Sequence, residues 1–199
     1  RALRREALLA NPLMAFDRLL LLKRSANNLA LPCNWESNSS IGHTGHDNAL
    51  LALSPVRPEA PLAEVFRPEG GRFLGDVDLH WNADRLLFSM PGKNGRWQVA
   101  EIQVDPATGA MKPGSLRELP LIPDKDVDNY DACYLPSGDV MFTSTAPFVG
   151  VPCVTGGSHV SNLFHLEAAT GRIRELAFDQ DHDWCPSVLN NGRVLYLRW

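Results

Sequence analysis

The sequence predicts an all-β fold: a β-propeller fragment with four-stranded antiparallel blades, of which about three and a half are present, preceded by a short N-terminal helix. Two observations lead to this prediction. Short apolar runs alternate with tight turns, and a unit of roughly fifty residues containing four such runs is repeated. A repeated four-stranded unit is typical of a propeller blade. A β-sandwich of short strands would explain the runs but not the repeat.

The composition excludes several classes of protein. The 199 residues are 44% hydrophobic and 21% charged, which is ordinary for a globular domain, and the net charge is −4. Because there is neither a basic surplus nor a run of Lys and Arg, we do not expect nucleic acid as a partner. No apolar run is long enough to span a membrane.

A short helix is expected at residues 2–10, ahead of the first strand. It should end at Asn11-Pro12, because proline cannot continue a helix. The chain starts at Arg1 and ends at Trp199, inside a predicted strand. We therefore expect a piece of a longer protein.

The strands divide the chain into one partial propeller domain. The first blade supplies only its second, third and fourth strands, and the last blade only its first and second. The four predicted blades cover about residues 16–69, 73–122, 130–178 and 184–199. Within the second blade, the outermost strand is expected at residues 116–122.

Equivalent positions recur at a fixed spacing. Phe88, Phe142 and Tyr196 each end a repeated ten-residue segment within the second strand of a blade, and they lie 54 residues apart. The turn glycines Gly138 and Gly192 keep the same spacing, and we expect a positive φ at Gly138. The spacing therefore fixes the register of the blades.

The loops predict which face carries function. Because consecutive strands are antiparallel, the connections from second to third strand and from fourth strand to the next blade emerge on one face. The turns on the other face are short, whereas this face holds long loops at 25–47 and 146–160. Long loops gathered on one face of a rigid scaffold usually carry function.

Acidic residues recur where each blade begins. The innermost strand of a blade lines the central channel, so these residues should gather at the channel mouth and bind a small molecule, a glycan or a cation. In the alternative, each aspartate caps a turn or ties neighbouring blades together. The predicted ligand-binding residues are Asp76, Asp78, Asp128, Tyr130, Asp131, Asp181, His182, Asp183 and Trp184.

Cysteine and histidine side chains in the two long loops suggest a second kind of site. His43 and His46 have the spacing of metal ligands, and Cys33 lies in the same loop, so a zinc or copper site is one interpretation. The alternative is loop structure, and for the cysteines a disulfide, a metal pair and free thiols all stay open. The candidate divalent-metal ligands are Cys33, His43, His46, Cys153 and His159. No Cys-x-x-Cys-His occurs, so this chain has no covalent haem site.

Several motifs resemble a known family. They are the segments 67–72, 128–136, 142–146, 150–153, 178–186 and 191–196. These segments look like the middle β-propeller domain of proteins related to the hydrazine synthase alpha subunit. The resemblance implies a six-bladed propeller in an exported bacterial multidomain protein, and hence a periplasmic or secreted location. It does not transfer haem chemistry.

Two functions follow as expectations. The first is a binding and scaffolding module whose acidic, Cys- and His-containing face binds a ligand, a metal or a neighbouring domain. Its partners would be flanking domains or the remaining propeller blades. The alternative is a metal-dependent or redox enzyme with Asp128, Asp131, Asp181, His182 and Cys153 on that face.

Overall fold

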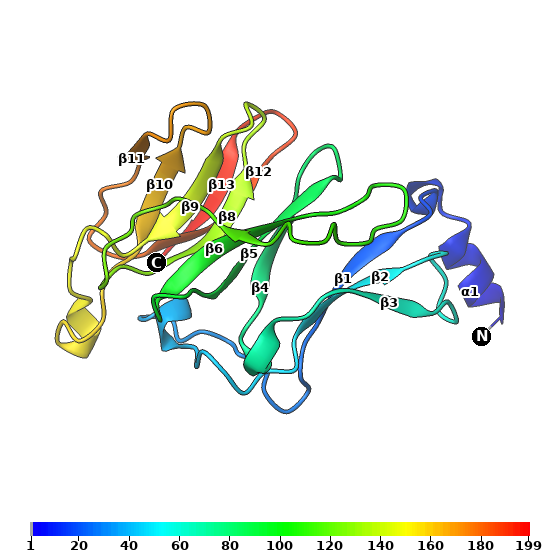
Figure 1. Ribbon diagram of the computed structural model, residues 1–199, viewed down its shortest axis with the longest axis horizontal. Helices are drawn as coiled ribbons and strands as arrows, with labels where there is room; N and C mark the ends of the chain where they lie inside the picture. Colours follow the sequence, from blue (N-terminus) through cyan, green and yellow to red (C-terminus); the bar gives the residue numbers. More distant parts are fainter. Residues whose placement is uncertain (1) are drawn as a thin grey trace.

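The computed structural model describes residues 2–199 and shows four antiparallel sheets, ordered along the chain (Figure 1). Two short helices come first: α1 (Ala2–Leu9) and η1 (Pro12–Met14). The first sheet is β1 (Leu19–Lys23), β2 (Ala49–Leu53) and β3 (Leu62–Phe66). The second is β4 (Gly75–Leu79), β5 (Arg85–Pro91), β6 (Trp97–Gln103) and β7 (Arg117–Glu118). The third is β8 (Asn129–Tyr134), β9 (Val140–Ser144), β10 (Asn162–Leu166) and β11 (Ile173–Glu175), and the fourth is β12 (Asp183–Val188) and β13 (Val194–Arg198).

This architecture confirms the predicted fold class. In the second and third sheets, four strands follow one another in chain order, and each is antiparallel to the next. The innermost strands β4, β8 and β12 pack side by side, β4 against β8 and β8 against β12. The sheets are therefore consecutive blades of an incomplete propeller.

The core consists of apolar layers between neighbouring sheets. Strand β5 shows why, because its alternate side chains enter two different layers: Phe88 packs toward the first sheet, whereas Leu87 packs toward the third. Phe142 lies with Leu87 in that second layer. A separate cluster of Ile41, Phe73, Trp97 and Tyr130 fills the space beneath the loop that joins β1 to β2.

The loops separate by length as expected in the third and fourth sheets, whereas in the second sheet the connection from β6 to β7, predicted to be short, spans residues 104–116. In Figure 1 the long connections gather along the lower edge, with the helices η2 (Asn38–Ser40), η3 (Glu69–Gly71) and η4 (Pro152–Val154). The tight turns of the third and fourth sheets lie along the upper edge. Gly138 has the predicted positive φ, +88°.

One strand is shorter than predicted. The outermost strand of the second sheet was expected at residues 116–122, but β7 contains only Arg117 and Glu118. Pro120 and Pro123 lack the N–H that a ladder needs, so the segment leaves the sheet. Leu119 and Leu121 are nevertheless buried in the layer between the second and third sheets. The prediction of a strand over the whole segment is therefore wrong, although two of its leucines are buried.

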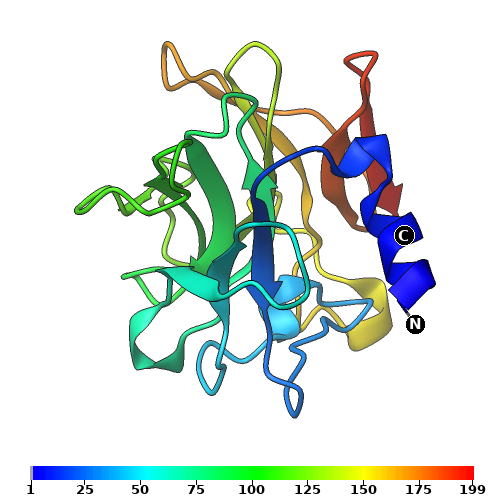
Figure 2. The same ribbon diagram turned by 90° about the vertical axis from the view of Figure 1, so that its right-hand side faces the viewer.

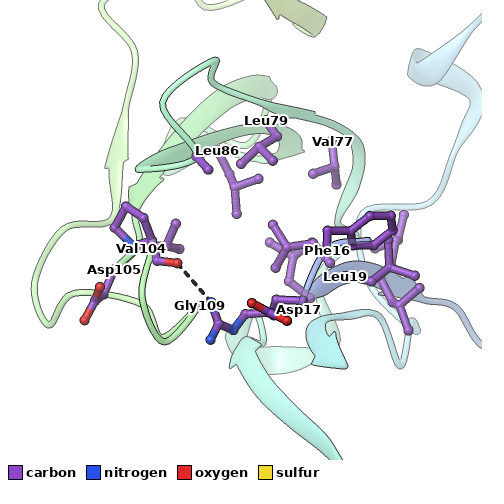
Figure 3. A pocket seen from close by; sticks show the side chains of 16 residues that line it. Phe16, Asp17, Leu19, Val77, Leu79, Leu86, Val104, Asp105 and Gly109 are labelled. Carbon is purple, nitrogen blue, oxygen red and sulfur yellow. Dashed lines mark hydrogen bonds between the residues drawn. The ribbon is translucent and has the colours of Figure 1, made fainter. Parts of the chain in front are cut away.

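An apolar groove of about 570 Å³ lies between β1 and the second sheet (Figure 3). Its walls come mainly from the four leucines at 19–22 and from Val77, Leu79 and Leu86. At one end Arg18 Nη1 donates to the carbonyl of Pro106 (2.9 Å). Among residues 2–199, β1 pairs only with β2, so the groove runs along a free strand edge, on the side of the molecule seen in Figure 2.

Candidate functional site

A pocket of about 500 Å³ lies on the long-loop face, where the innermost strands begin. It collects side chains from segments far apart in the sequence. Asp76 comes from β4, Asp131 from β8, and Trp184 and Cys185 from β12, while Cys33 comes from the loop between β1 and β2. This is the channel-mouth position that the repeat predicts for Asp76, Asp131 and Trp184.

The three inner strands present equivalent residues to the pocket because each contains a bulge. The register with the next strand shifts within β4, β8 and β12 at the same point. The bulged residues Asp76, Asp131 and Cys185 have φ values of +50°, +52° and +54°. Non-glycine residues adopt this left-handed conformation at a cost, and bulges commonly redirect a side chain next to a functional site.

Asp131 joins two blades from inside the pocket. Its carboxylate accepts a hydrogen bond from the N–H of Cys185, and its own N–H donates to Ser89 Oγ (2.7 Å). Burial, with a contribution from the charge of Asp76, raises the pKa of Asp131 to about 7. The fold therefore disfavours the ionised form of this carboxyl.

Asp76 is held by the loop above it. Asn38, in η2, donates from Nδ2 to Asp76 Oδ2 at 2.5 Å. Arg24 also lines the pocket, and its Nη1 donates to the carbonyl of Leu29 (3.1 Å). The guanidinium therefore adds one positively charged group to a lining that also contains two carboxyls.

Aromatic rings form the opposite part of the pocket. Trp184 and Trp199 both line it, and the ring of His182 lies behind Trp184 with the centroids 4.6 Å apart. His182 is fully buried, and its Nδ1 accepts a hydrogen bond from the N–H of Ser161 (3.0 Å). Burial lowers the pKa of His182, so this predicted ligand residue is a neutral support for the indole.

Asp128 is placed in a structural network instead of the pocket. Its Oδ1 accepts from the N–H of Trp97 (3.0 Å), and its Oδ2 accepts from Ser39 Oγ (2.7 Å) and pairs with Arg96 Nη2 (2.9 Å). It is 4% exposed. The carboxylate thereby ties the long loop of the first blade to the start of β6, as the blade-tying alternative for these aspartates describes.

Asp78 and Tyr130, two further predicted ligand-binding residues, contact other parts of the fold and not the pocket. Asp78 Oδ2 accepts from the N–H of Tyr134 (2.9 Å) across two inner strands, and burial raises the pKa of Asp78. Tyr130 is fully buried between Phe73 and Trp97, and burial raises the pKa of its phenol. Neither residue lines the pocket.

The remaining acidic residues lie at the edge of the fourth sheet. Asp183 is fully buried, and its Oδ1 accepts from Arg198 Nε (3.0 Å). Arg198 also pairs with Asp179. Burial, with the charge of Asp179 contributing, raises the pKa of Asp183 to about 6. Asp181 is partly exposed beside His182 and outside the pocket.

The five candidate metal ligands are dispersed. His46 Nε2 donates to the carbonyl of Gly42 (2.6 Å), and the ring of His43 packs edge-on against Trp97. His159 packs on Phe148, and Cys153 is exposed in η4. In the part of the chain that the structure describes, no group of three or more His, Cys, Asp and Glu side chains is arranged to hold a metal ion. All four cysteines are free.

The pocket also contains residues that sequence reasoning missed. Cys185 is not among the predicted site residues, yet it lies 54 residues after Asp131, so the repeat spacing could have identified it. Arg24 and Trp199 carry no comparable signal. Arg24 directly follows β1 and Trp199 directly follows β13, and only the packing of the blades brings them together.

Comparison with known proteins supports the fold. No family model and no curated protein matches the sequence. Among solved structures, TolB from Acinetobacter baumannii is similar with a TM-score of 0.52 and 16% identity, over 76% of this chain and 32% of that one. A puromycin-hydrolyzing peptidase from Mycobacterium tuberculosis is similar with a TM-score of 0.54 and 12% identity, over 90% of this chain and 26% of that one. The chain thus has a TolB-like β-propeller fold and spans about a third or less of either relative. In the described residues, no helix is long and apolar enough to cross a membrane.

Proposed function

We propose that this chain is a binding and scaffolding module, and that the pocket between Asp76 and Trp184 binds a small polar ligand. It would form one partial propeller domain, with the blades at 16–69, 73–122, 130–178 and 184–199, in an exported bacterial protein. The resemblance to proteins related to the hydrazine synthase alpha subunit supports this context, as well as a periplasmic or secreted location.

One observation carries the proposal. Three equivalent bulges and one long loop direct carboxyl, thiol and indole groups into a single cavity. Simple ties between blades would not require this convergence, because Asp128 and Asp78 achieve such ties away from the pocket. The volume, about 500 Å³, falls within the range of about 300–1,000 Å³ that is usual for small-molecule sites.

The apolar groove beside β1 supports the scaffolding part of the proposal. Strand β1 lies at the edge of the first sheet and pairs on one side only, with β2. Its leucines line the groove next to this unpaired edge. Free apolar edges readily pair with another strand. We propose that a strand from the remaining blades or from a flanking domain covers this groove in the full-length protein.

A second candidate function is a metal-dependent or redox enzyme with its site on the same face. The observation in its favour is the carboxyl of Asp131, whose pKa of about 7 suits proton transfer, beside the thiols of Cys33 and Cys185. A divalent metal would have Asp76 and Asp131 as its nearest oxygen ligands. Elemental analysis and the visible spectrum of the full-length protein distinguish this candidate, which requires stoichiometric metal or a redox-active chromophore.

The binding proposal is tested by native mass spectrometry of the full-length protein isolated from the exported fraction. We expect a small molecule to accompany the wild type and to be lost from Trp184→Ala. The matched control is Trp81→Ala, because Trp81 is 58% exposed and lies outside the pocket. Equal ligand occupancy in the two variants, or none in the wild type, would contradict the pocket as the binding site.

A further inference from the structure

The lining of the pocket contains both apolar and polar side chains. Trp184, Trp199 and Leu197 contribute the apolar part, with the indole of Trp184 backed by His182. Asp76, Asp131 and Arg24 contribute the polar part. An indole that already has a packed partner behind it offers a fixed surface to a ligand, because its rotamer is restrained.

The polar part can both donate and accept hydrogen bonds. A carboxyl accepts hydrogen bonds, and as the acid it also donates one, so Asp131, whose ionisation is disfavoured by burial, can do both. Asp76 adds an acceptor, and the guanidinium of Arg24 adds donors. Because Arg24 lies in the same wall, the pocket does not have the concentrated negative charge that favours an organic cation.

A pyranose ring matches these two parts. Its C–H faces are flat and apolar and pack against indoles, while its edge carries hydroxyl groups that donate and accept at short intervals. We infer that the ligand of this pocket is a neutral sugar residue, stacked on Trp184 with its hydroxyls on Asp76, Asp131 and Arg24. This inference rests on the proposed binding function and specifies its ligand class.

The test uses the full-length protein and two series of probes, measured by titration calorimetry. Neutral oligosaccharides (cellotetraose, chitotetraose and maltotetraose) probe the inference, and spermidine and tryptamine probe the cationic alternative. We expect at least one oligosaccharide to bind, with affinity about tenfold or more weaker in Trp184→Ala and unchanged in Trp81→Ala. Asp131→Ala should also weaken the binding of this oligosaccharide, because the substitution removes a carboxyl that forms hydrogen bonds with it.

The outcomes separate the inference from the function on which it rests. Binding of an amine but of no oligosaccharide would overturn the sugar and leave the pocket as a binding site. Oligosaccharide binding that Trp184→Ala and Trp81→Ala weaken equally would overturn this pocket as the sugar site. Failure of both series would overturn the sugar inference, whereas the native mass spectra decide independently whether the pocket binds anything. Circular dichroism of each variant shows whether a loss of affinity reflects lost folding.

Discussion

The backbone N–H of Cys185 donates a hydrogen bond to the carboxylate of Asp131, and both residues occupy the bulge of an inner strand. The contact joins two neighbouring blades at the wall of the pocket. Because Asp131 is also held by Ser89 from the preceding blade, this one residue fixes the relative positions of three sheets. The geometry of the pocket and the docking of the blades therefore depend on the same residue, through its carboxylate toward Cys185 and its backbone N–H toward Ser89.

The raised pKa of Asp131 predicts a pH-dependent stability. The pKa is about 7 in the fold against an ordinary value of 3.8, so the folded protein binds more protons than the unfolded chain between about pH 4 and 7. The free energy of unfolding therefore falls as the pH rises through this window. Asp131→Asn keeps an acceptor for Cys185 and should reduce this fall, leaving the part below about pH 6 that Asp183 contributes. Urea unfolding at several pH values measures it.

Asp105→Asn is the matched control, because the fold lowers the pKa of Asp105 and raises that of Asp131. A hydrogen bond from the N–H of Ala107 lowers the pKa of Asp105, so this carboxylate favours the fold above about pH 4. In Asp105→Asn the free energy of unfolding should still fall as the pH rises toward 7. A pH profile of Asp131→Asn identical to that of the wild type would contradict the assignment.

Asp128 should matter for stability and not for ligand binding. Asp128→Ala leaves the N–H of Trp97 and the guanidinium of Arg96 without their acceptor, which should cost about 2–4 kcal/mol in the free energy of unfolding. Asp47→Ala removes two exposed ion pairs and should change the melting temperature little. Comparable thermal shifts for the two variants would refute the structural role of Asp128.

The turn between β8 and β9 requires a glycine at position 138, so replacing Gly138 should lower the free energy of unfolding. Gly138 has φ +88°, and a Cβ at this position would meet no atom within 4 Å, so a side chain there meets backbone strain alone. Gly138→Val should cost about 1–3 kcal/mol. Gly42 has an ordinary φ and space for a methyl group, so Gly42→Ala serves as the control. An unchanged melting temperature for Gly138→Val would contradict the register of the turn.

The free edge of β1 predicts a contact in the full-length protein. If a strand covers the apolar groove, the outward-facing amides of Leu19–Lys23 should exchange slowly with deuterium, in contrast to those of an uncovered edge. Hydrogen-exchange mass spectrometry of the full-length protein measures this protection. Leu21→Arg, in the groove, should raise the exchange rate, and exchange of wild-type β1 at the rate of an open edge would rule out the covering strand.

The repeat explains why so much of the architecture was predictable. Strands β8 and β9 lie where the spacing of Phe88, Phe142 and Tyr196 places them, because the apolar pattern repeats from blade to blade. Strands β5 and β9 are buried on both faces, as this pattern predicts for inner strands of a propeller. The place of Asp76 and Asp131 where the inner strands begin likewise predicted that both lie at the channel mouth. The repeated apolar pattern therefore predicts the strand order and the buried positions within each blade.

The division of roles among the acidic residues was not predictable in the same way. Asp128 and Asp131 are three residues apart in one segment, yet the first closes a network under the long loop and the second lines the pocket. Asp131 is itself the bulged residue of β8 and lines the pocket, and a bulge leaves no clear mark in an apolar pattern. Trp199 and Arg24 depended on contacts between blades, which a single sequence does not show.

The most direct test of the account is the titration of the Asp131 carboxyl in the full-length protein. With ¹³C-labelled aspartate, the carboxyl resonance that disappears in Asp131→Asn can be followed with pH. We predict a midpoint near 7 that falls in Asp76→Asn, because removing the neighbouring charge favours ionisation. A midpoint near 4 that is unchanged by Asp76→Asn would contradict a buried, interacting carboxyl pair in the wall of this pocket.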